Sequence, residues 1–419
     1  MEESPVSQTR LPDAASFTVE SLNRPEVIAN PYPYYALLRD RPPQFGLRDW
    51  PPGTVPGQDV PEPSWVFLKY ADVAAAAKNH DAFSSRDPMQ EASDAPTLML
   101  VNHDRPRHTV LRNIAKQAFT PKRVEHDVAP WVERTVAGMI AELPDGDVEF
   151  MHDFAEVLPA RVMTRLIGTP EGDYDKLRRW ASAFMVTSDF TLEERNQCNR
   201  EIAMYYAEAV AERYRDIERG LTPPDDLMTA FIRAEDEGES LTRDEVTRFC
   251  LTLVVAGAET TGYLLGNLAC TLAQEPQFFP MLKQDRRLVR PFIEESLRRD
   301  GPPQRLFRVA TMDVEIGGAQ IRAGEWAALF YAAANRDPAV FESPDEFILN
   351  RPNVGRQLTF GHGIHHCMGA GIARLEADKM INGLLDRCSR IDPGSQPFKR
   401  QTGGLLNYGL DRCPIVLVR

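Results

Sequence analysis

One short segment of the chain concentrates the residue types that bind metal ions. It reads Phe360-Gly-His-Gly-Ile-His-His-Cys367-Met-Gly369, and helical spacing follows it from Gly369 to Leu385. A thiolate at the start of a helix is stabilised by the helix dipole and by free backbone N–H groups. Glycines let the backbone approach a flat ligand closely. The segment therefore has what a thiolate ligand of iron requires, with Cys367 as the donor.

Two other interpretations of Cys367 remain open at this point. A cysteine in a glycine-rich turn can be a buried structural residue that binds nothing. A zinc site is the second alternative, because His362, His365, His366 and Cys367 are all possible ligands. These four residues crowd into six positions, however, and no second cysteine or histidine pair follows at the usual spacing.

A long helix is predicted from Thr242 to about Ala273. Thr242 and Glu245 form a capping-box pattern, and Pro276 marks the other end. At 1.5 Å per residue this helix is about 48 Å long, enough to cross the whole molecule. Its middle must therefore be largely buried.

Polar residues and glycines interrupt the middle of this helix. They are Gly257, Glu259, Thr260, Thr261 and Gly262. Glycine in a helix costs about 0.5–1 kcal/mol relative to alanine, and buried polar groups are also unfavourable. We therefore expect these residues to serve something other than packing.

Composition and pattern define the class of protein. The 419 residues carry a net charge of −13, which argues against nucleic-acid binding. Six scattered cysteines, no signal peptide and no apolar run of about 20 residues predict a cytoplasmic protein without a membrane span. Residues 40–65 are rich in proline and glycine and are expected to form an irregular loop.

The pattern along the chain predicts a mainly α fold with a smaller β portion. Helical spacing dominates residues 72–274, and short β-prone runs such as Val314-Glu-Ile and Trp326-Ala-Ala-Leu-Phe-Tyr follow Gly301. No break in composition indicates a second domain, so residues 1–419 are expected to form one domain.

The Cys367 segment resembles the haem-binding signature of the cytochrome P-450 superfamily, F-G-x-G-x-H-x-C-x-G-x-x-x-A-R. All eight fixed positions match, from Phe360 to Arg374. The resemblance implies the P-450 fold, with haem b (iron protoporphyrin IX) between the long helix and the Cys367 loop. It makes Cys367 the proximal thiolate, whose electron donation favours O–O cleavage, and places His365 on a haem propionate.

The interrupted helix matches a second family motif. Ala256-Gly-Ala-Glu259-Thr260-Thr261 resembles A-G-x-[DE]-T-[ST]. Reduction of O2 consumes protons, which a hydroxyl can deliver and an acid can replenish. Thr260 and Glu259 are the expected pair, and their presence favours O2 over peroxide as the oxidant.

Further family positions follow in the expected order. Glu295-x-x-Arg298 resembles the E-x-x-R motif, and Arg351 is placed like the third member of its structural cluster, which is expected to hold the loop that presents Cys367. By resemblance His108, Arg112 and Arg308 bind the two haem propionates, for which guanidinium donors are well suited.

The resemblance implies a monooxygenase that inserts one oxygen atom of O2 into a small to medium hydrophobic substrate. Family substrate contacts come from regions near Met89 to Val101 and Phe184 to Phe190 and from individual apolar positions. These positions are Leu100, Val255, Ala258, Leu306, Phe307 and Leu406. The alternative function is a haem-binding carrier or sensor without turnover, which would not need the Glu259 and Thr260 pair.

Electrons must come from a separate protein, because no nucleotide-binding glycine motif follows the Cys367 segment. The resemblance implies a ferredoxin with its NAD(P)H-dependent reductase. Five basic residues are expected on the side of the molecule that bears Cys367, where an acidic ferredoxin would dock. They are Arg105, Arg107, Arg112, Lys116 and Arg374.

Overall fold

The computed structural model describes residues 11–13, 16–48, 62–87, 98–184 and 190–419. Its helices are α1 (Pro25–Ala29), α2 (Tyr32–Arg39), α3 (Tyr70–Lys78), α5 (Arg107–Ala118), α6 (Pro121–Arg123), α7 (Ala129–Glu142), α8 (Val157–Ile167), α9 (Tyr174–Phe184), α10 (Leu192–Glu218), α11 (Leu227–Arg233), α12 (Arg243–Gln274), α13 (Phe278–Gln284), α14 (Val289–Asp300), α15 (Tyr331–Ala334) and α16 (Ala370–Arg387). Its strands are β1 (Gln44–Leu47), β2 (Ser64–Phe67), β3 (Phe83–Ser84), β4 (Gly146–Glu149), β5 (Glu235–Asp236), β6 (Glu239–Ser240), β7 (Leu306–Ala310), β8 (Val314–Ile316), β9 (Ala319–Ile321), β10 (Trp326–Leu329), β11 (Arg390–Pro393), β12 (Lys399–Arg400), β13 (Leu410–Arg412) and β14 (Pro414–Val418). The predicted mainly α chain with a smaller β portion is confirmed.

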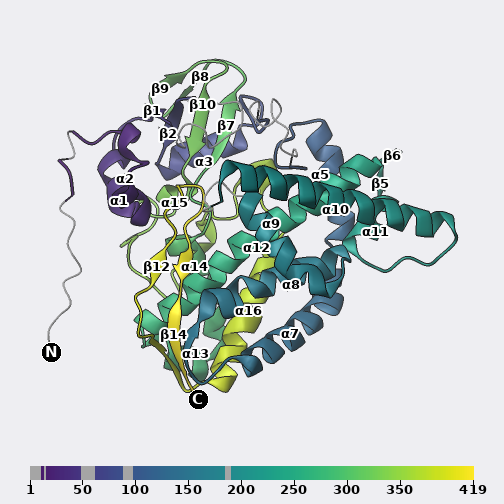
Figure 1. Cartoon of the computed structure of the whole chain (residues 1–419). Coiled ribbons are helices and arrows are strands. Elements are labelled where there is room, and N and C mark those ends of the chain that lie inside the picture. The colour runs from purple at the N-terminus through teal and green to yellow at the C-terminus, as the bar shows by residue number, and fades with distance from the viewer. Residues whose placement is uncertain (1–10, 14–15, 49–61, 88–97, 185–189) are drawn as a thin grey trace.

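Helix α12 is the central element of the fold (Figure 1). The Thr242 hydroxyl accepts from the N–H of Glu245 at 3.2 Å, and the Glu245 carboxylate accepts from the N–H of Thr242 at 2.9 Å, so the capping box is present. The helix packs against α8, α9 and α10. Among the described helices it alone is long and apolar enough to cross a membrane, yet 67% of its apolar stretch is buried inside the protein. It is therefore the core helix that the sequence predicts.

Close packing explains the two glycines of α12, contrary to our expectation. A Cβ atom added to Gly257 would lie 2.7 Å from the sulfur of Met163 on α8. One added to Gly262 would lie 3.2 Å from the carbonyl oxygen of Ala155, just before α8. Small residues at these two positions let α8 approach α12, so the expectation that something other than packing requires them is wrong for the glycines.

The main sheet lies at one end of the molecule, beside the N-terminal helices, whereas β12 and β14 lie near α13 and α14 (Figure 1). The main sheet has the strand order β1-β2-β10-β7-β3, with β10 parallel to β2 and antiparallel to β7. The predicted runs near Val314 and Trp326 become β8 and β10. The predicted irregular loop over residues 40–65 is wrong in part, because β1 and the start of β2 fall within it and residues 49–61 lie outside the described residues.

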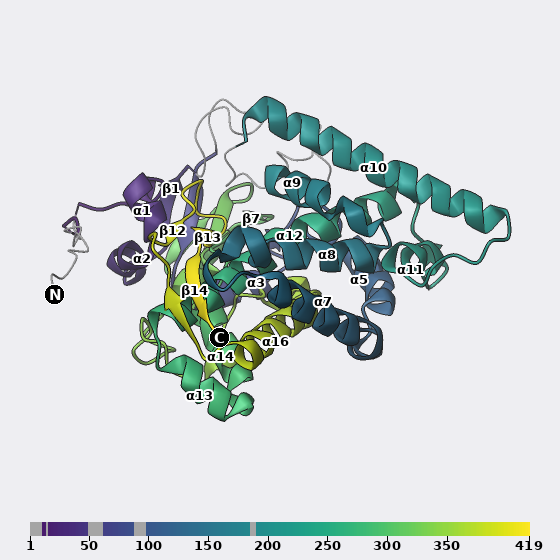
Figure 2. The same ribbon diagram turned by 60° about the horizontal axis from the view of Figure 1, so that its bottom comes forward.

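Helix α16 carries the predicted metal-binding cysteine just before its first residue. It lies between α7 and α14 and also contacts α12. Figure 2 shows α16 beneath the layer formed by α8 and α12, with α10 along the opposite edge of that layer. Helix α16 thus packs against helices from three distant parts of the chain.

A glycine-to-alanine substitution in each helix tests the packing of α16 on α7. A Cβ atom at Gly383 of α16 would lie 2.6 Å from Ile140 Cδ1 and 3.2 Å from Val136 Cγ1, whereas one at Gly138 of α7 would meet nothing within 4 Å. We expect Gly383→Ala to lower the free energy of unfolding by about 1 kcal/mol or more, because overpacking outweighs helix propensity. Gly138→Ala should raise it by up to about 1 kcal/mol. Urea unfolding of both variants measures this, and equal effects would contradict the packing argument.

Candidate haem site

The loop before α16 brings Cys367 to an exposed position. The N–H of Cys367 donates to the carbonyl of Phe360 at 2.8 Å and closes the loop. Gly361 and Gly363 have φ values of +76° and +73°, which side chains rarely adopt. A Cβ atom on Gly363 would also lie 2.7 Å from the carbonyl oxygen of Ala77 on α3. The glycines are therefore needed both for the turn and for its close packing on α3.

Cys367 differs from every other cysteine of the chain. All six cysteines lie in the described residues, and only Cys367 is exposed. Desolvation by the surrounding protein raises the pKa of its thiol. Backbone N–H groups of Gly369 and Ala370, together with the guanidinium groups of Arg112 and Arg374, act in the opposite direction. The site thus holds donors for a thiolate, and a metal ion would deprotonate the thiol outright.

Cationic and imidazole groups converge beside this loop. The rings of His108 and His365 lie 4.4 Å apart, and His365 Nε2 is 2.9 Å from the hydroxyl of Ser85. Burial and then the charges of Arg308, His108 and Arg112 lower the pKa of His365 to about 3. Burial and neighbouring positive groups, chiefly Arg112, lower the pKa of His108 to about 4. The four residues that are predicted to bind the haem propionates therefore lie close together.

The same cluster fits a bound dicarboxylate. His108 is 2% exposed, and its Nε2 atom has no hydrogen-bond partner among the described residues. A buried polar atom without a partner is unfavourable, and a concentration of positive charge favours an anion. Two propionate groups of a haem would supply both a partner for His108 and the counter-charge for Arg112 and Arg308.

Arg112 and Arg308 each also donate a hydrogen bond to a backbone carbonyl. Arg112 Nη2 donates to the carbonyl of His366 at 2.7 Å, directly before Cys367. Arg308 is 7% exposed, and its Nη1 donates to the carbonyl of Phe307 at 2.6 Å. Arg112 therefore connects α5 to the Cys367 loop, whereas the bond of Arg308 stays within its own strand, β7.

The predicted acid and alcohol lie on α12, at the point where its side chains are less buried. Ala256 is exposed although it lies in the middle of this core helix. The Thr260 hydroxyl donates to the carbonyl of Ala256 at 2.8 Å, which leaves its oxygen lone pairs to accept. Glu259 Oε1 accepts from the hydroxyl of Tyr263 at 2.9 Å. Sequence reasoning named Ala256 only as part of the motif and missed Tyr263, which lies one helical turn after Glu259.

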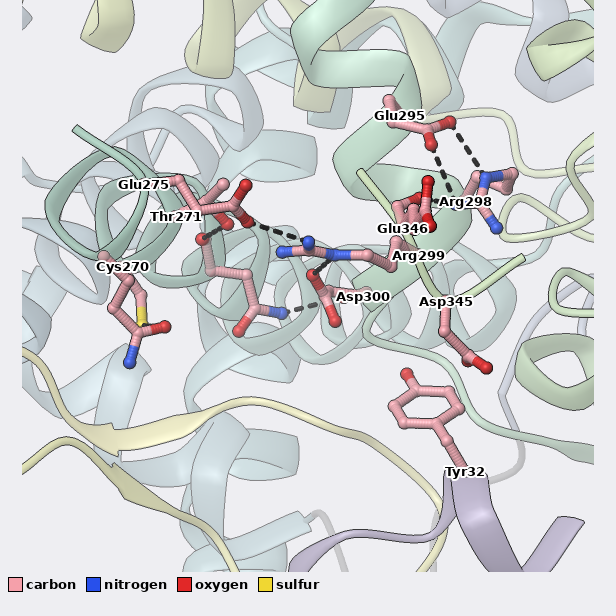
Figure 3. Close-up of polar contacts among 12 residues, drawn as sticks. Tyr32, Cys270, Thr271, Glu275, Glu295, Arg298, Arg299, Asp300, Asp345 and Glu346 are labelled. Atoms are coloured by element: carbon pink, nitrogen blue, oxygen red, sulfur yellow. Dashed lines mark hydrogen bonds and ion pairs between the residues drawn. The ribbon is translucent and has the colours of Figure 1, made fainter. Parts of the chain in front are cut away.

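The predicted structural cluster is formed and fully buried. Glu295 binds Arg298 at 2.8 Å (Figure 3). It also binds Arg351 at 3.0 Å and accepts from the N–H of Ile348 at 2.9 Å. Arg298 Nη1 donates further to the carbonyl of Asn335 at 3.0 Å. Figure 3 also shows Arg299, which forms ion pairs with Glu275 at 2.9 Å and with Asp300 at 2.8 Å.

This cluster holds the Cys367 loop indirectly. Among the described contacts, its arginines donate to carbonyls between residues 335 and 346 and not to the loop itself. Asn335 completes the connection, because its side chain accepts from the N–H of Leu358 at 2.7 Å and donates to Thr359 at 2.9 Å. Thr359 lies next to Phe360, where the loop begins.

The proposed substrate contacts fall into two groups. Leu306, Phe307 and Leu406 lie on neighbouring segments, since the N–H of Gln304 donates to the carbonyl of Leu406 at 2.9 Å and Leu306 is 36% exposed. Leu100 is half-buried and packs against the core.

Val255 and Ala258 are both buried in the core. Ala258 lies about 200° around α12 from the exposed Ala256, so it does not share the face of Ala256 and Thr260. The regions 89–97 and 185–189, which belong to the expected substrate contacts, lie outside the described residues.

The expected basic face is smaller than the sequence indicates. Arg107 binds Glu239 and Glu245, and Arg374 makes a bidentate ion pair with Glu294 at 2.7 and 2.9 Å. The expectation that these two arginines are available to a partner is wrong, because acids distant in the sequence neutralise them. Arg105 and Lys116 remain exposed.

Comparisons with known proteins agree with this geometry. The family model of Cytochrome P450 matches residues 161–408. The chain is 34% identical to the biotin biosynthesis cytochrome P450 of Bacillus subtilis, over 88% of this chain and 91% of that protein. It is 35% identical to the cytochrome P450 monooxygenase PikC of Streptomyces venezuelae, over 86% and 84% of the two chains.

Solved structures are similar over nearly the whole chain. The cytochrome P450 CYP109Q5 of Chondromyces apiculatus has a TM-score of 0.82 at 29% identity, over 95% of this chain and 97% of that one. P450BioI in complex with a fatty-acid-ligated acyl carrier protein has a TM-score of 0.82 at 31% identity, over 94% and 99%. These structures share the fold of this chain over more than nine tenths of its length.

We expect Arg112→Ala to release haem about tenfold faster, because the substitution removes a charge-assisted donor and the bond to the His366 carbonyl. Transfer of haem to apomyoglobin measures the rate. Lys116→Ala, one turn further on the same helix and exposed, is the control and should leave the rate unchanged. An Arg112→Ala rate equal to that of the control would remove Arg112 from the haem site.

Proposed function

The chain belongs to the cytochrome P450 family of bacterial monooxygenases, and on that premise we propose its reaction. One oxygen atom of O2 enters a C–H or C=C bond of a small to medium hydrophobic substrate, and the other leaves as water. The reaction consumes two electrons and two protons. The electrons come from a ferredoxin with its NAD(P)H-dependent reductase, and we expect the protein to work in the cytoplasm.

One observation carries the proposal: an exposed cysteine at a helix start, beside a cluster of cationic groups around a buried unpartnered histidine. In this proposal Cys367 ligates haem iron, and His108, Arg112, Arg308 and His365 bind the propionates. When bound, the haem supplies the binding and activation of O2. The proposed cofactor is haem b, since the sequence has no C-x-x-C-H attachment motif.

The chain's own residues handle the protons. Thr260 is tied to the backbone carbonyl of Ala256, so its oxygen is held on the exposed face of α12. Glu259, the neighbouring acid, replenishes the protons that the reaction consumes. Glu295, Arg298 and Arg351 play a structural role, because they are buried and bind one another.

Relatives support a hydrophobic substrate. They include a vitamin D(3) 25-hydroxylase, a 6-deoxyerythronolide B hydroxylase and a cyclomarin C epoxidase. A solved neighbour is described in complex with corticosterone. Leu306, Phe307 and Leu406 would provide apolar contacts of the same kind here.

Oxygen incorporation tests the proposed function directly. The holoprotein is supplied with a ferredoxin, its reductase and NAD(P)H, and hydrophobic compounds are screened first for a high-spin shift of the Soret band. A monooxygenase consumes NAD(P)H in response to a bound compound and transfers label from ¹⁸O2 into product. A carrier or sensor binds the compound without either response, and that result would refute the proposal.

We expect Thr260→Ala to bind substrate normally but to convert more of the consumed NAD(P)H into hydrogen peroxide, since it removes a group needed only after O2 binds. Thr247→Ala is the matched control. The Thr247 hydroxyl donates to the carbonyl of Arg243, four residues before it on α12, as that of Thr260 does to Ala256, and this bond lies on an exposed part of the helix. The ratio of product to NAD(P)H measures the effect. An unchanged ratio in Thr260→Ala would argue against a role for this hydroxyl.

Lys116 and Arg105 are the proposed contacts for an acidic ferredoxin. We expect Lys116→Glu to slow reduction by ferredoxin at low salt and to flatten its salt dependence, because long-range attraction between the two proteins is screened beyond about 8 Å at physiological ionic strength. Stopped-flow reduction at two ionic strengths measures both. Lys176→Glu on α9, which packs on α8, α10 and α12, is the control. Equal rates for the parent and Lys116→Glu at low salt would exclude Lys116.

A further inference from the structure

We propose that Tyr263 is a positioning residue that holds the carboxylate of Glu259 where it can replenish the protons consumed in turnover. The proposal rests on the proposed function, since it concerns the acid of that reaction. Tyr263 lies outside the motif of residues 256–261 that the sequence identifies. Tyr263 itself does not touch the reacting atoms in this proposal and acts through Glu259.

The geometry of α12 places the two side chains together. Tyr263 follows Glu259 by four residues, so both lie on one face of the helix. The Tyr263 hydroxyl donates to Glu259 Oε1 at 2.9 Å. A glutamate side chain has several rotatable bonds, and a donor fixed on the same helix restricts the position of its carboxylate.

The backbone of Gly409 fixes the Tyr263 ring. A Cβ atom added to Gly409 would lie 2.0 Å from Cγ and from Cδ1 of the ring, so the ring rests directly on this glycine. Gly409 precedes β13, in a segment far from α12 in the sequence. The position of the phenol is therefore set by two separate elements.

The charges around Tyr263 keep its hydroxyl a donor. Burial, the negative charge of Glu259 and the hydrogen bond to it, and the charges of Glu156 and Asp411 all raise the pKa of Tyr263 above its ordinary value. The phenol therefore stays protonated throughout the physiological range. A donor to an ionised carboxylate stabilises the charged form, so the bond favours ionised Glu259.

The other two acids near the phenol are engaged elsewhere. Glu156 accepts from Arg178 Nη1 at 2.6 Å and lies 3.4 Å from the ring nitrogen of His152. Asp411 binds Lys399 at 2.5 Å. Glu259 is thus the carboxylate that accepts the hydrogen bond of the Tyr263 hydroxyl.

The variant Tyr263→Phe removes only the hydroxyl. We expect kcat to fall about tenfold while KM for the substrate stays within twofold, because a hydrogen bond to a charged group is lost and no substrate contact changes. The solvent isotope effect on kcat should rise, since proton supply becomes slower. In the Glu259→Gln background the same substitution should have no further effect on kcat.

A second readout is independent of turnover. Infrared titration of the substrate-free holoprotein follows the carboxylic acid C=O band that disappears in Glu259→Gln. In Tyr263→Phe the midpoint of this band should move upward by about one pH unit, because the carboxylate has lost the hydrogen bond from Tyr263. Tyr205→Phe is the matched control. Tyr205 of α10 donates to a different carboxylate, that of Asp173, at 2.6 Å, so its loss should leave the band and kcat unchanged.

Either an unmoved infrared midpoint or an unchanged kcat in Tyr263→Phe overturns the proposal. Haem content and the reduced carbonyl spectrum establish that the variant is folded. If Tyr263→Phe fails to fold, Glu259→Asp replaces it, because the shorter side chain withdraws the carboxylate from the phenol and should move the midpoint in the same direction. A parent protein that forms no product refutes the proposed function, and the infrared titration still decides whether Tyr263 holds Glu259.

Discussion

The buried carboxylate of Glu295 is the constraint on which the arrangement of the site depends. An ionised carboxylate inside a protein must have its partners nearby, since an unpaired buried charge costs several kcal/mol. Arg298, Arg351 and the N–H of Ile348 satisfy it. The remaining guanidinium donors need acceptors of their own and take backbone carbonyls from the segment after α15. One charge thereby fixes the irregular chain from which the Cys367 loop starts.

Local signals made part of this structure predictable. The capping box of Thr242 and Glu245 and the i, i+3 pair of Glu295 and Arg298 act through neighbours in the sequence, and both form as predicted. Contacts between distant segments were not predictable. Gly257 is small because Met163 of α8 lies against it, and β2 exists because β10 pairs with it.

The same distinction applies to the charges of the site. The sequence identifies Arg107 and Arg374 as basic, but their partners Glu239, Glu245 and Glu294 come from other parts of the chain. Tyr263 was missed for a related reason, since its ring is placed by Gly409. A tyrosine one helical turn after an acidic residue is common. Only the contact with Gly409, which lies outside α12, shows that the position of the Tyr263 ring is fixed.

The parallel pairing of β2 with β10 has a consequence for how the protein is made. Ser64 is opposite Trp326, about 260 residues later in the chain, and Ser85 meets His365 across a separation of 280 residues. Contacts of such long range form slowly, because a large loop must be closed before they contribute any stability. On the ribosome, the N-terminal strands must wait for most of the chain to emerge. Both this sheet and the packing of α16 on α7 therefore form only after most of the chain has been made.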